Sequence, residues 1–343
     1  MTHHRLLSAV CLLAASFAHA ETYTVQSPDN RVQVAVTNDA KGLSYSVALD
    51  GNKFISNSAL GLIINDLPLG NAELDFVGKT QNKVKDSFEL VAGRTKKVND
   101  HYNTITLKFA GKDERKLNLN VVVRAYDNGI AIRYLLPEQS GLKNFTIQNE
   151  LTRFSFASDY TCYGLNLGKF ANSHEGEFDP IKASAIREHN LYDNPLVCKT
   201  GVGQTTFALA ESDVRDYPGS WFVGRGDGGL GVGVKLTPRF DSRPDGLEKA
   251  AVRATMTAAG IKSPWRVIML GDNPGDLAES SLIATLGEST KIKDTRWIKP
   301  GKTAWDWWND NQVVLENTDV KPGMNTETYK AYIDFAATLV LEY

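Results

Sequence analysis

The 343-residue sequence has few cysteines and no excess of charge of either sign. Its formal net charge is −2, so it lacks the basic excess that is typical of nucleic-acid-binding proteins. It has three cysteines and no Cys-x-x-Cys pair, which argues against a structural zinc site. With 42% hydrophobic and 23% charged residues, it also lacks the compositional bias of a disordered or fibrous chain. These absences leave an ordinary globular protein.

The sequence has only one long apolar run, and that run lies at the N-terminus. Residues 6–17 follow Arg5 and are too short to span a bilayer. The Ala-His-Ala sequence before Glu21 has the pattern of a signal-peptidase site. We therefore predict a signal peptide at residues 1–20 and a periplasmic or secreted protein. A buried N-terminal helix fits the flanking residues less well, and no later stretch is apolar enough to span a membrane.

Removal of this segment would leave Cys162 and Cys198, because Cys11 lies within it. In an oxidising compartment the two remaining cysteines can form a disulfide. Their spacing does not tell whether they meet in space, so a disulfide and two free buried thiols are both open.

From residue 22 to about residue 259, the dominant hydrophobic period is two, which is typical of β-strands. The clearest hairpin joins two β-rich runs at Asp127-Asn128-Gly129. Many short strands with few helical runs between them predict a mostly β fold built on a large antiparallel β-sandwich. Further strand-like runs lie at residues 145–156, 195–211, 229–236, 250–258 and 265–270.

The pattern changes after residue 271. Residues 272–289 predict a helix that is capped by Asp272 or Asn273. A linker follows at residues 290–302, and the sequence TAWDWWN from Thr303 predicts a short strand. The segment from Asn325 to the end predicts a second helix with Asn325 as its N-cap. A strand followed by a helix forms a βα unit, which cannot bury both of its faces alone.

Two motifs are excluded by their context. The sequence GDGGLG at residues 226–231 matches the dinucleotide motif, but a strand-like run follows it where that motif requires a helix. We interpret it as a glycine-rich β-turn. The sequence HEGEF has Phe178 where a zinc protease would need its second histidine, and no nucleophile elbow occurs.

Three polar or aromatic segments are candidates for binding. The loop that contains Glu175 carries further carboxylates, which suit a hard cation or simply a solvated acidic loop. The loop that contains Glu188 carries groups that suit a sugar, although a surface loop with an Arg–Glu pair explains it as well. Trp305, Trp307 and Trp308 surround a carboxylate, as in many carbohydrate sites, or fill a core.

Taken together, five segments of the sequence resemble glycoside hydrolase family 97, a family of exported bacterial α-glucosidases and α-galactosidases. No single segment is specific, but their order is, and the resemblance covers essentially the whole chain after residue 20. The segments are residues 158–180, 194–219, 264–283, 304–310 and 323–337.

The resemblance implies a domain order and an activity. It implies a β-super-sandwich at residues 21–289, a linker at 290–302 and, at 303–343, the first βα unit of an incomplete catalytic (β/α)8 barrel. Family members hydrolyse α-glycosidic bonds of oligosaccharides. Their catalytic carboxylates lie on later barrel strands, so the resemblance assigns no catalytic residue here and predicts that the chain is inactive alone.

The resemblance also implies candidate ligands. Family members use Ca²⁺ near the active site, and either Glu175 or Glu188 would contribute one ligand. Trp305, Asp306 and Asn309 would contact the sugar at the barrel mouth or its first strand. A non-catalytic carbohydrate-binding sandwich is the alternative function, and a structural domain that docks through its last helix is a third.

Overall fold

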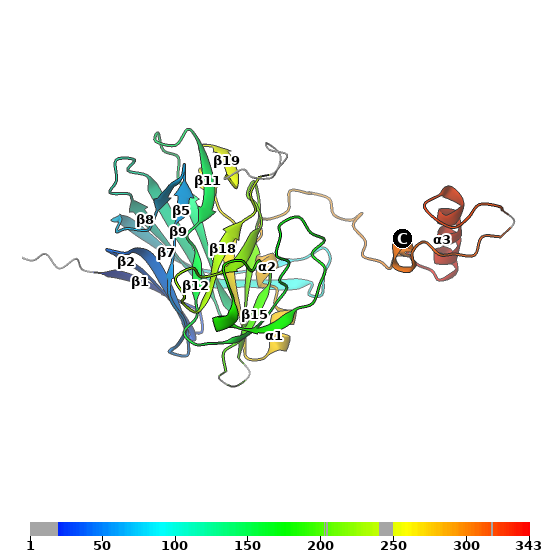
Figure 1. Cartoon of the computed structure of the whole chain (residues 1–343), viewed down its shortest axis with the longest axis horizontal. Coiled ribbons are helices and arrows are strands. Elements are labelled where there is room, and N and C mark those ends of the chain that lie inside the picture. Colours follow the sequence, from blue (N-terminus) through cyan, green and yellow to red (C-terminus); the bar gives the residue numbers. More distant parts are fainter. Residues whose placement is uncertain (1–19, 202, 204, 240–249, 317) are drawn as a thin grey trace, which may run out of the picture. The chain divides into compact units, whose positions relative to one another are not determined.

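The computed structural model of the chain describes residues 20–201, 203, 205–239, 250–316 and 318–343 (Figure 1). The predicted signal peptide, apart from its last residue, lies outside this part of the chain. The described residues form two compact units. The first contains the residues up to Phe88 and those of Val98–Glu288, and the second contains Glu89–Lys97 and Ser289–Tyr343.

The largest sheet of the first unit has ten strands in the order β14-β13-β15-β16-β21-β10-β9-β8-β7, with β20 paired to β10. The β9–β10 hairpin pairs Tyr126 with Gly129, which confirms the turn predicted there. The strands are β7 (Asp75–Glu89), β8 (Lys97–Ala110), β9 (Asn118–Tyr126), β10 (Gly129–Leu136), β13 (Thr161–Gly164), β14 (Asp179–Lys182), β15 (Leu196–Lys199), β16 (Thr206–Ser212), β20 (Ile261–Lys262) and β21 (Trp265–Gly271).

Smaller antiparallel sheets have the orders β1-β2-β3-β4, β19-β11-β5-β6 and β12-β18-β17. The run predicted at residues 145–156 is divided between β11 and β12. The strands are β1 (Glu21–Gln26), β2 (Val32–Asp39), β3 (Gly42–Leu49), β4 (Asn52–Ala59), β5 (Leu62–Ile64), β6 (Leu67–Leu69), β11 (Asn144–Glu150), β12 (Arg153–Ser155), β17 (Ser220–Gly224), β18 (Gly231–Leu236) and β19 (Val252–Thr255).

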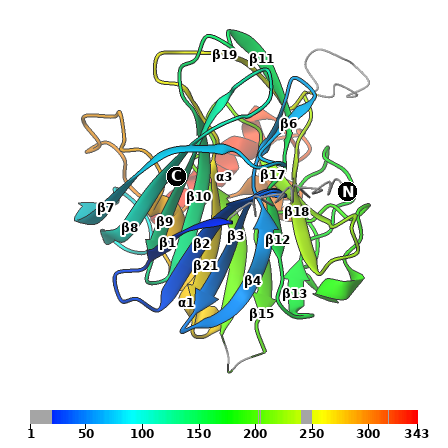
Figure 2. The same cartoon turned by 90° about the vertical axis from the view of Figure 1, so that its left-hand side faces the viewer.

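The smaller sheets cover one face of the largest sheet, and the main core lies between them (Figure 2). Along β2 and β9, buried residues alternate with less buried ones, as the period of two in the sequence predicts. Val34 of β2, Val123 of β9 and Phe154 of β12 belong to one buried cluster. The predicted mostly β sandwich is therefore confirmed for this unit.

Two short helices cover part of the other face of the largest sheet. They are α1 (Pro274–Glu279) and α2 (Leu282–Thr285), and Leu282 packs in one cluster with Trp265 of β21. Asn273, one of the two predicted caps, begins α1 with a capping box. The prediction of a single helix at residues 272–289 is wrong, because two short helices occupy this segment. Ser280 is extended and its hydroxyl accepts a hydrogen bond from the Leu282 amide, which interrupts the helix.

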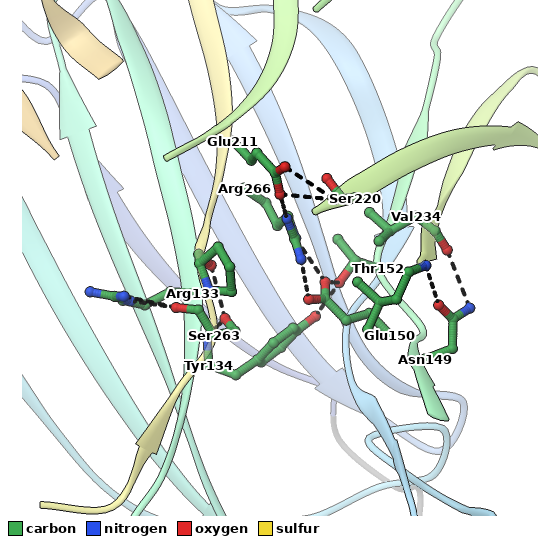
Figure 3. Close-up of polar contacts among 12 residues, drawn as sticks. Arg133, Tyr134, Asn149, Glu150, Thr152, Glu211, Ser220, Val234, Ser263 and Arg266 are labelled. Atoms are coloured by element: carbon green, nitrogen blue, oxygen red, sulfur yellow. Dashed lines mark hydrogen bonds and ion pairs between the residues drawn. The ribbon is translucent and has the colours of Figure 1, made fainter. Parts of the chain in front are cut away.

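A buried cluster of charges crosses the core (Figure 3). The guanidinium of Arg266 on β21 donates to Glu150 at the end of β11, with an Nη2–Oε1 distance of 2.6 Å and an Nε–Oε2 distance of 3.0 Å. Its Nη1 donates to Glu211 of β16 at 2.5 Å. The side chains of Arg266 and Glu150 are 2% and 0% exposed, so the bidentate pair is shielded from water.

Neutral polar groups complete the cluster and reach the other sheets. Thr152 donates to Glu150 at 2.8 Å, and the hydroxyl of Tyr134 lies 2.7 Å from that of Thr152. Both carboxylate oxygens of Glu211 accept from the Ser220 amide at 3.1 Å, at the first residue of β17. Burial opposes the charge on Arg266, but attraction by Glu150 outweighs it and raises the pKa of the guanidinium.

Cys162 of β13 and Cys198 of β15 form a disulfide. The two residues lie directly opposite each other in the β13–β15 pair, and both are fully buried. Of the two alternatives that the sequence left open, the disulfide is the one present. It joins neighbouring strands near the β14 edge of the largest sheet.

The second unit contains a 3-10 helix, η2 (Asp306–Asn309), and the helix α3 (Thr326–Thr338). Asn325 caps α3 by accepting from the Thr328 amide, as predicted. The prediction of a strand from Thr303 is wrong, because residues 306–309 form the 3-10 helix η2. No strand of the described chain pairs with this segment, and a turn satisfies backbone groups that a lone strand would leave unpaired. Across the part of the chain that the structure describes, every helix is too short or too polar to cross a membrane.

The buried charge cluster makes a prediction about stability. Arg266→Met should lower the free energy of unfolding by about 3–5 kcal/mol, because it leaves the Glu150 carboxylate buried without its cation. Urea unfolding followed by circular dichroism measures this loss. The matched control Arg296→Met removes a cation whose side chain is 90% exposed and should change stability by less than about 0.5 kcal/mol. Equal effects of the two substitutions would contradict the prediction.

Candidate functional site

The three clustered tryptophans lie together on the surface around η2. The Trp305 ring lies 5.8 Å from Trp307 and 5.6 Å from Trp308, measured between ring centroids. Trp305 is 53% exposed and Trp308 is 80% exposed. Within their unit these rings therefore present an open aromatic surface, and the alternative that they fill a core does not describe this arrangement.

The two polar residues predicted beside them differ in role. The Asn309 side chain donates to the Gln312 carbonyl at 2.8 Å and accepts from the Tyr332 hydroxyl of α3 at 2.5 Å. The side chain of Asp306 accepts a hydrogen bond that raises the pKa of Tyr329. Asn309 is thus engaged in holding η2 against α3, while the tryptophan faces remain available to a ligand.

The loop that contains Glu175 packs over β17. The ring of His174 stacks on Trp221 with 5.4 Å between the centroids, and its Nδ1 lies 2.5 Å from a carboxylate oxygen of Asp193. Phe170 meets the same indole edge-on at 5.9 Å. Glu175 itself is exposed at the surface of this loop. The loop is therefore anchored by its aromatic residues, and Glu175 faces solvent.

The loop that contains Glu188 packs at the other end of β17. The backbone carbonyl of Arg187 accepts a hydrogen bond from the Gly224 amide at 3.0 Å. It also accepts one from the Asn190 amide, and this second bond closes a turn. The Glu188 carboxylate lies against the backbone of Gly226, where a Cβ atom would stand 1.9 Å from its Oε1. Glycine at position 226 is thus required for Glu188 to take this place.

Two cavities meet at Glu188. One has a volume of about 410 Å³ and is lined on its polar side by Lys41 and Arg153. The other has a volume of about 440 Å³ and lies beside Arg187 and His189. Both are lined by Glu188 together with Arg225 and Gly226. Volumes of this size are those of small-molecule sites in proteins.

The arrangement does not build a complete calcium site from this chain. In the part of the chain that the structure describes, no group of three or more His, Cys, Asp or Glu side chains is placed to hold a metal. Glu175 and Glu188 belong to different loops, one beside Trp221 and the other beside Gly226.

Residues 226–231 form the glycine-rich turn that the sequence predicts, between β17 and β18. What this turn contacts is not predictable from the sequence. Glycine at 229 leaves space for the Arg225 guanidinium, which a Cβ atom would approach to 2.6 Å. The two glycines and the following strand were visible in the sequence, but the partner loop with Glu188 lies too far away along the chain to be recognised from local pattern.

The comparisons with known proteins agree with this fold. Residues 25–289 match the family model for the glycosyl-hydrolase 97 N-terminal domain. The chain is 29% identical to a retaining alpha-galactosidase of Bacteroides thetaiotaomicron, over 98% of this chain and 51% of that protein. It is 26% identical to a probable retaining alpha-galactosidase of Streptomyces bingchenggensis, over 97% of this chain and 48% of that protein.

A solved structure is similar over the same region. A glycoside hydrolase family 97 enzyme of Pseudoalteromonas sp. strain K8, in complex with acarbose, superposes with a TM-score of 0.80 and 27% identity. The match covers 93% of this chain and 46% of that one. The chain thus spans about half the length of the relatives that it matches.

The turn at Gly226 yields a prediction about pH. A hydrogen bond from Arg225 lowers the pKa of Asp227 to about 2, with Arg153 adding a weaker attraction. A lowered pKa in the folded state stabilises the protein above about pH 4, and this contribution disappears as the pH falls through about 2. Arg225→Gln should raise the pKa of Asp227 toward about 3.9.

A carboxyl NMR titration of Asp227 measures this shift. Arg296→Gln, which removes the partner of Asp294 instead, should leave the titration of Asp227 unchanged. A pKa near 3.9 for Asp227 in the unchanged protein would contradict the geometry described for this turn.

Proposed function

The chain belongs to the glycosyl-hydrolase 97 family, and from this membership we propose that it is part of an exported α-glycosidase. The proposed reaction is hydrolysis of α-galactosidic or α-glucosidic bonds of oligosaccharides. The observation that carries the proposal is the family match over residues 25–289, together with alpha-galactosidases as relatives along nearly the whole chain. The apolar run at residues 6–17 supports export, and a purified periplasmic form beginning at Glu21 would test it.

The proposed chemistry needs more than this chain supplies. Hydrolysis of a glycosidic bond requires two positioned carboxyl groups, one that protonates the leaving oxygen and one that acts as nucleophile or activates water. Both free carboxylates in candidate positions, Glu175 and Glu188, lie in separate loops, and we assign a catalytic role to neither. We propose that the catalytic carboxylates belong to later strands of a (β/α)8 barrel that residues 303–343 begin.

The tryptophan cluster has a place in this proposal. Pairing with a neighbouring barrel strand would replace the backbone hydrogen bonds that Ala304 and Trp308 now donate to Tyr343 and Trp305, and η2 would then become the first strand. Trp305 and Asp306 are proposed to contact the sugar, the first through its ring face and the second through its carboxylate. Asn309, which is already engaged by Tyr332, is proposed to contact sugar only after the same rearrangement.

An alternative function is a sandwich that binds carbohydrate without cleaving it. The two cavities at Glu188 favour it, because they lie wholly within the first unit. The two functions differ in turnover: both permit sugar binding, but only the first predicts that a longer protein containing this chain hydrolyses its ligand.

We expect the purified chain to release no p-nitrophenol from p-nitrophenyl α-galactoside or α-glucoside, and a protein of the length of its relatives to release it. The physical reason is the missing pair of carboxylates. Absorbance at neutral pH measures the release. Turnover by the chain alone that is lost in a Glu175→Gln or Glu188→Gln variant would show that the site is complete without a barrel and would contradict the proposal.

Calcium is proposed as the metal of the complete enzyme, with Glu175 as the ligand from this chain. We expect the chain alone to bind Ca²⁺ weakly, with a dissociation constant of about 10⁻³ M or higher, because few ligands are gathered. Calorimetry should detect a further loss in Glu175→Gln and no change in the matched variant Glu188→Gln. The reverse order would assign the metal to Glu188.

A further inference from the structure

We propose that the carboxylate of Glu188 and the guanidinium of Arg225 form a saccharide-binding site on the sandwich. The inference starts from the turn between β17 and β18. Glycine at positions 226 and 229 leaves room for the two charged groups, since a Cβ atom at either position would overlap one of them. The absence of a Cβ atom at these two positions therefore allows the two side chains to lie against the turn.

The two groups retain capacity for hydrogen bonding. No hydrogen bond or ion pair joins the Glu188 carboxylate to another described residue, although it lines both cavities. Arg225 donates from Nη1 to the Leu230 carbonyl at 3.2 Å and from Nη2 to Asp227 at 2.7 Å. Nη1 and Nη2 each carry a second N–H, and the Arg225 side chain is 16% exposed. An unpaired carboxylate and a guanidinium with remaining N–H groups thus line the same two cavities.

The charges around the cavities decide the class of ligand. Arg153 and Glu150 line the first cavity but are already in ion pairs with other residues, so the unpaired carboxylate of Glu188 is too little by itself to hold a metal cation. An anion would be repelled by the free carboxylate of Glu188, which lines both cavities. A neutral ligand rich in hydroxyl groups avoids this repulsion, because each hydroxyl donates to a carboxylate and accepts from a guanidinium.

The cavities also suit a sugar in size and in the chemistry of their walls. Their volumes of about 410 and 440 Å³ adjoin at Glu188, which gives space for two linked rings. Apolar side chains such as Leu60 and Val223 line the first cavity and Leu230 lines the second, so C–H faces of a ring have apolar contacts. The ligand is therefore a neutral disaccharide or the end of a longer chain, and this choice rests on the proposed glycosidase function.

Two substitutions test the site by different means. Glu188→Gln removes the charge, whereas Gly226→Ala keeps it but places a Cβ atom where the carboxylate lies. Both should weaken binding of melibiose or maltose to the full chain about tenfold, as expected for the loss of a hydrogen bond to a charged group. Isothermal calorimetry measures the affinity, and thermal unfolding shows whether each variant is folded.

Matched controls distinguish the site from general effects. Glu138→Gln removes an exposed carboxylate elsewhere, and Gly111→Ala adds a Cβ atom whose nearest neighbour is 3.4 Å away. Both controls should bind the disaccharides as the unchanged protein does. Tenfold losses confined to Glu188→Gln and Gly226→Ala would support the site.

Three results would overturn it: unchanged disaccharide affinity in Glu188→Gln, binding of galacturonate or phosphate in preference to both neutral sugars, or Ca²⁺ binding that Glu188→Gln abolishes. None of these bears on hydrolysis by a longer protein, which the p-nitrophenyl glycosides measure separately. The failure of this site and the failure of the glycosidase proposal are therefore distinguishable.

Discussion

Arg266 is held between two carboxylates in a largely apolar core, and this interaction ties three sheets of the sandwich together. Its bidentate contact reaches Glu150 of β11, and its remaining nitrogen reaches Glu211 in its own sheet. Glu211 in turn accepts from the first residue of β17. A buried ion pair adds little net stability over apolar packing, but misplacing either partner is costly. Its main effect is therefore to restrict how the sheets align.

The candidate site depends on that alignment through β17. The strand begins at Ser220, which the charge cluster fixes, and its next residue, Trp221, supports the loop of Glu175. Its last residue, Gly224, allows close approach of the backbone before Glu188. Both loops are thus positioned by one short strand. A change in the core at Arg266 would be expected to disturb both loops even though neither contacts it.

The second unit presents a different problem, because it has much exposed apolar surface. Its helix α3 buries Thr328 and Ala336, while Ile333 and Leu339 remain 66% and 55% exposed. Apolar residues of this segment are therefore largely uncovered within the second unit. Helices of this kind gain most of their stability from packing rather than from propensity. The proposed barrel, with further strands and helices beside this one, would bury those residues.

Local sequence pattern was enough to predict the sandwich, the β9–β10 hairpin, the glycine turn and the cap at Asn325, and it narrowed the cap of α1 to Asp272 or Asn273. Each of these features depends on local spacing or on a residue's own conformational preference. The sequence by itself did not determine that Cys162 meets Cys198, that residues 303–309 turn rather than extend, or that Glu188 rests on Gly226. Those features depend on residues distant in sequence, or on whether a neighbouring strand is present. Only the tertiary structure brings such partners together, because pairing across sheets is set by packing of the whole core.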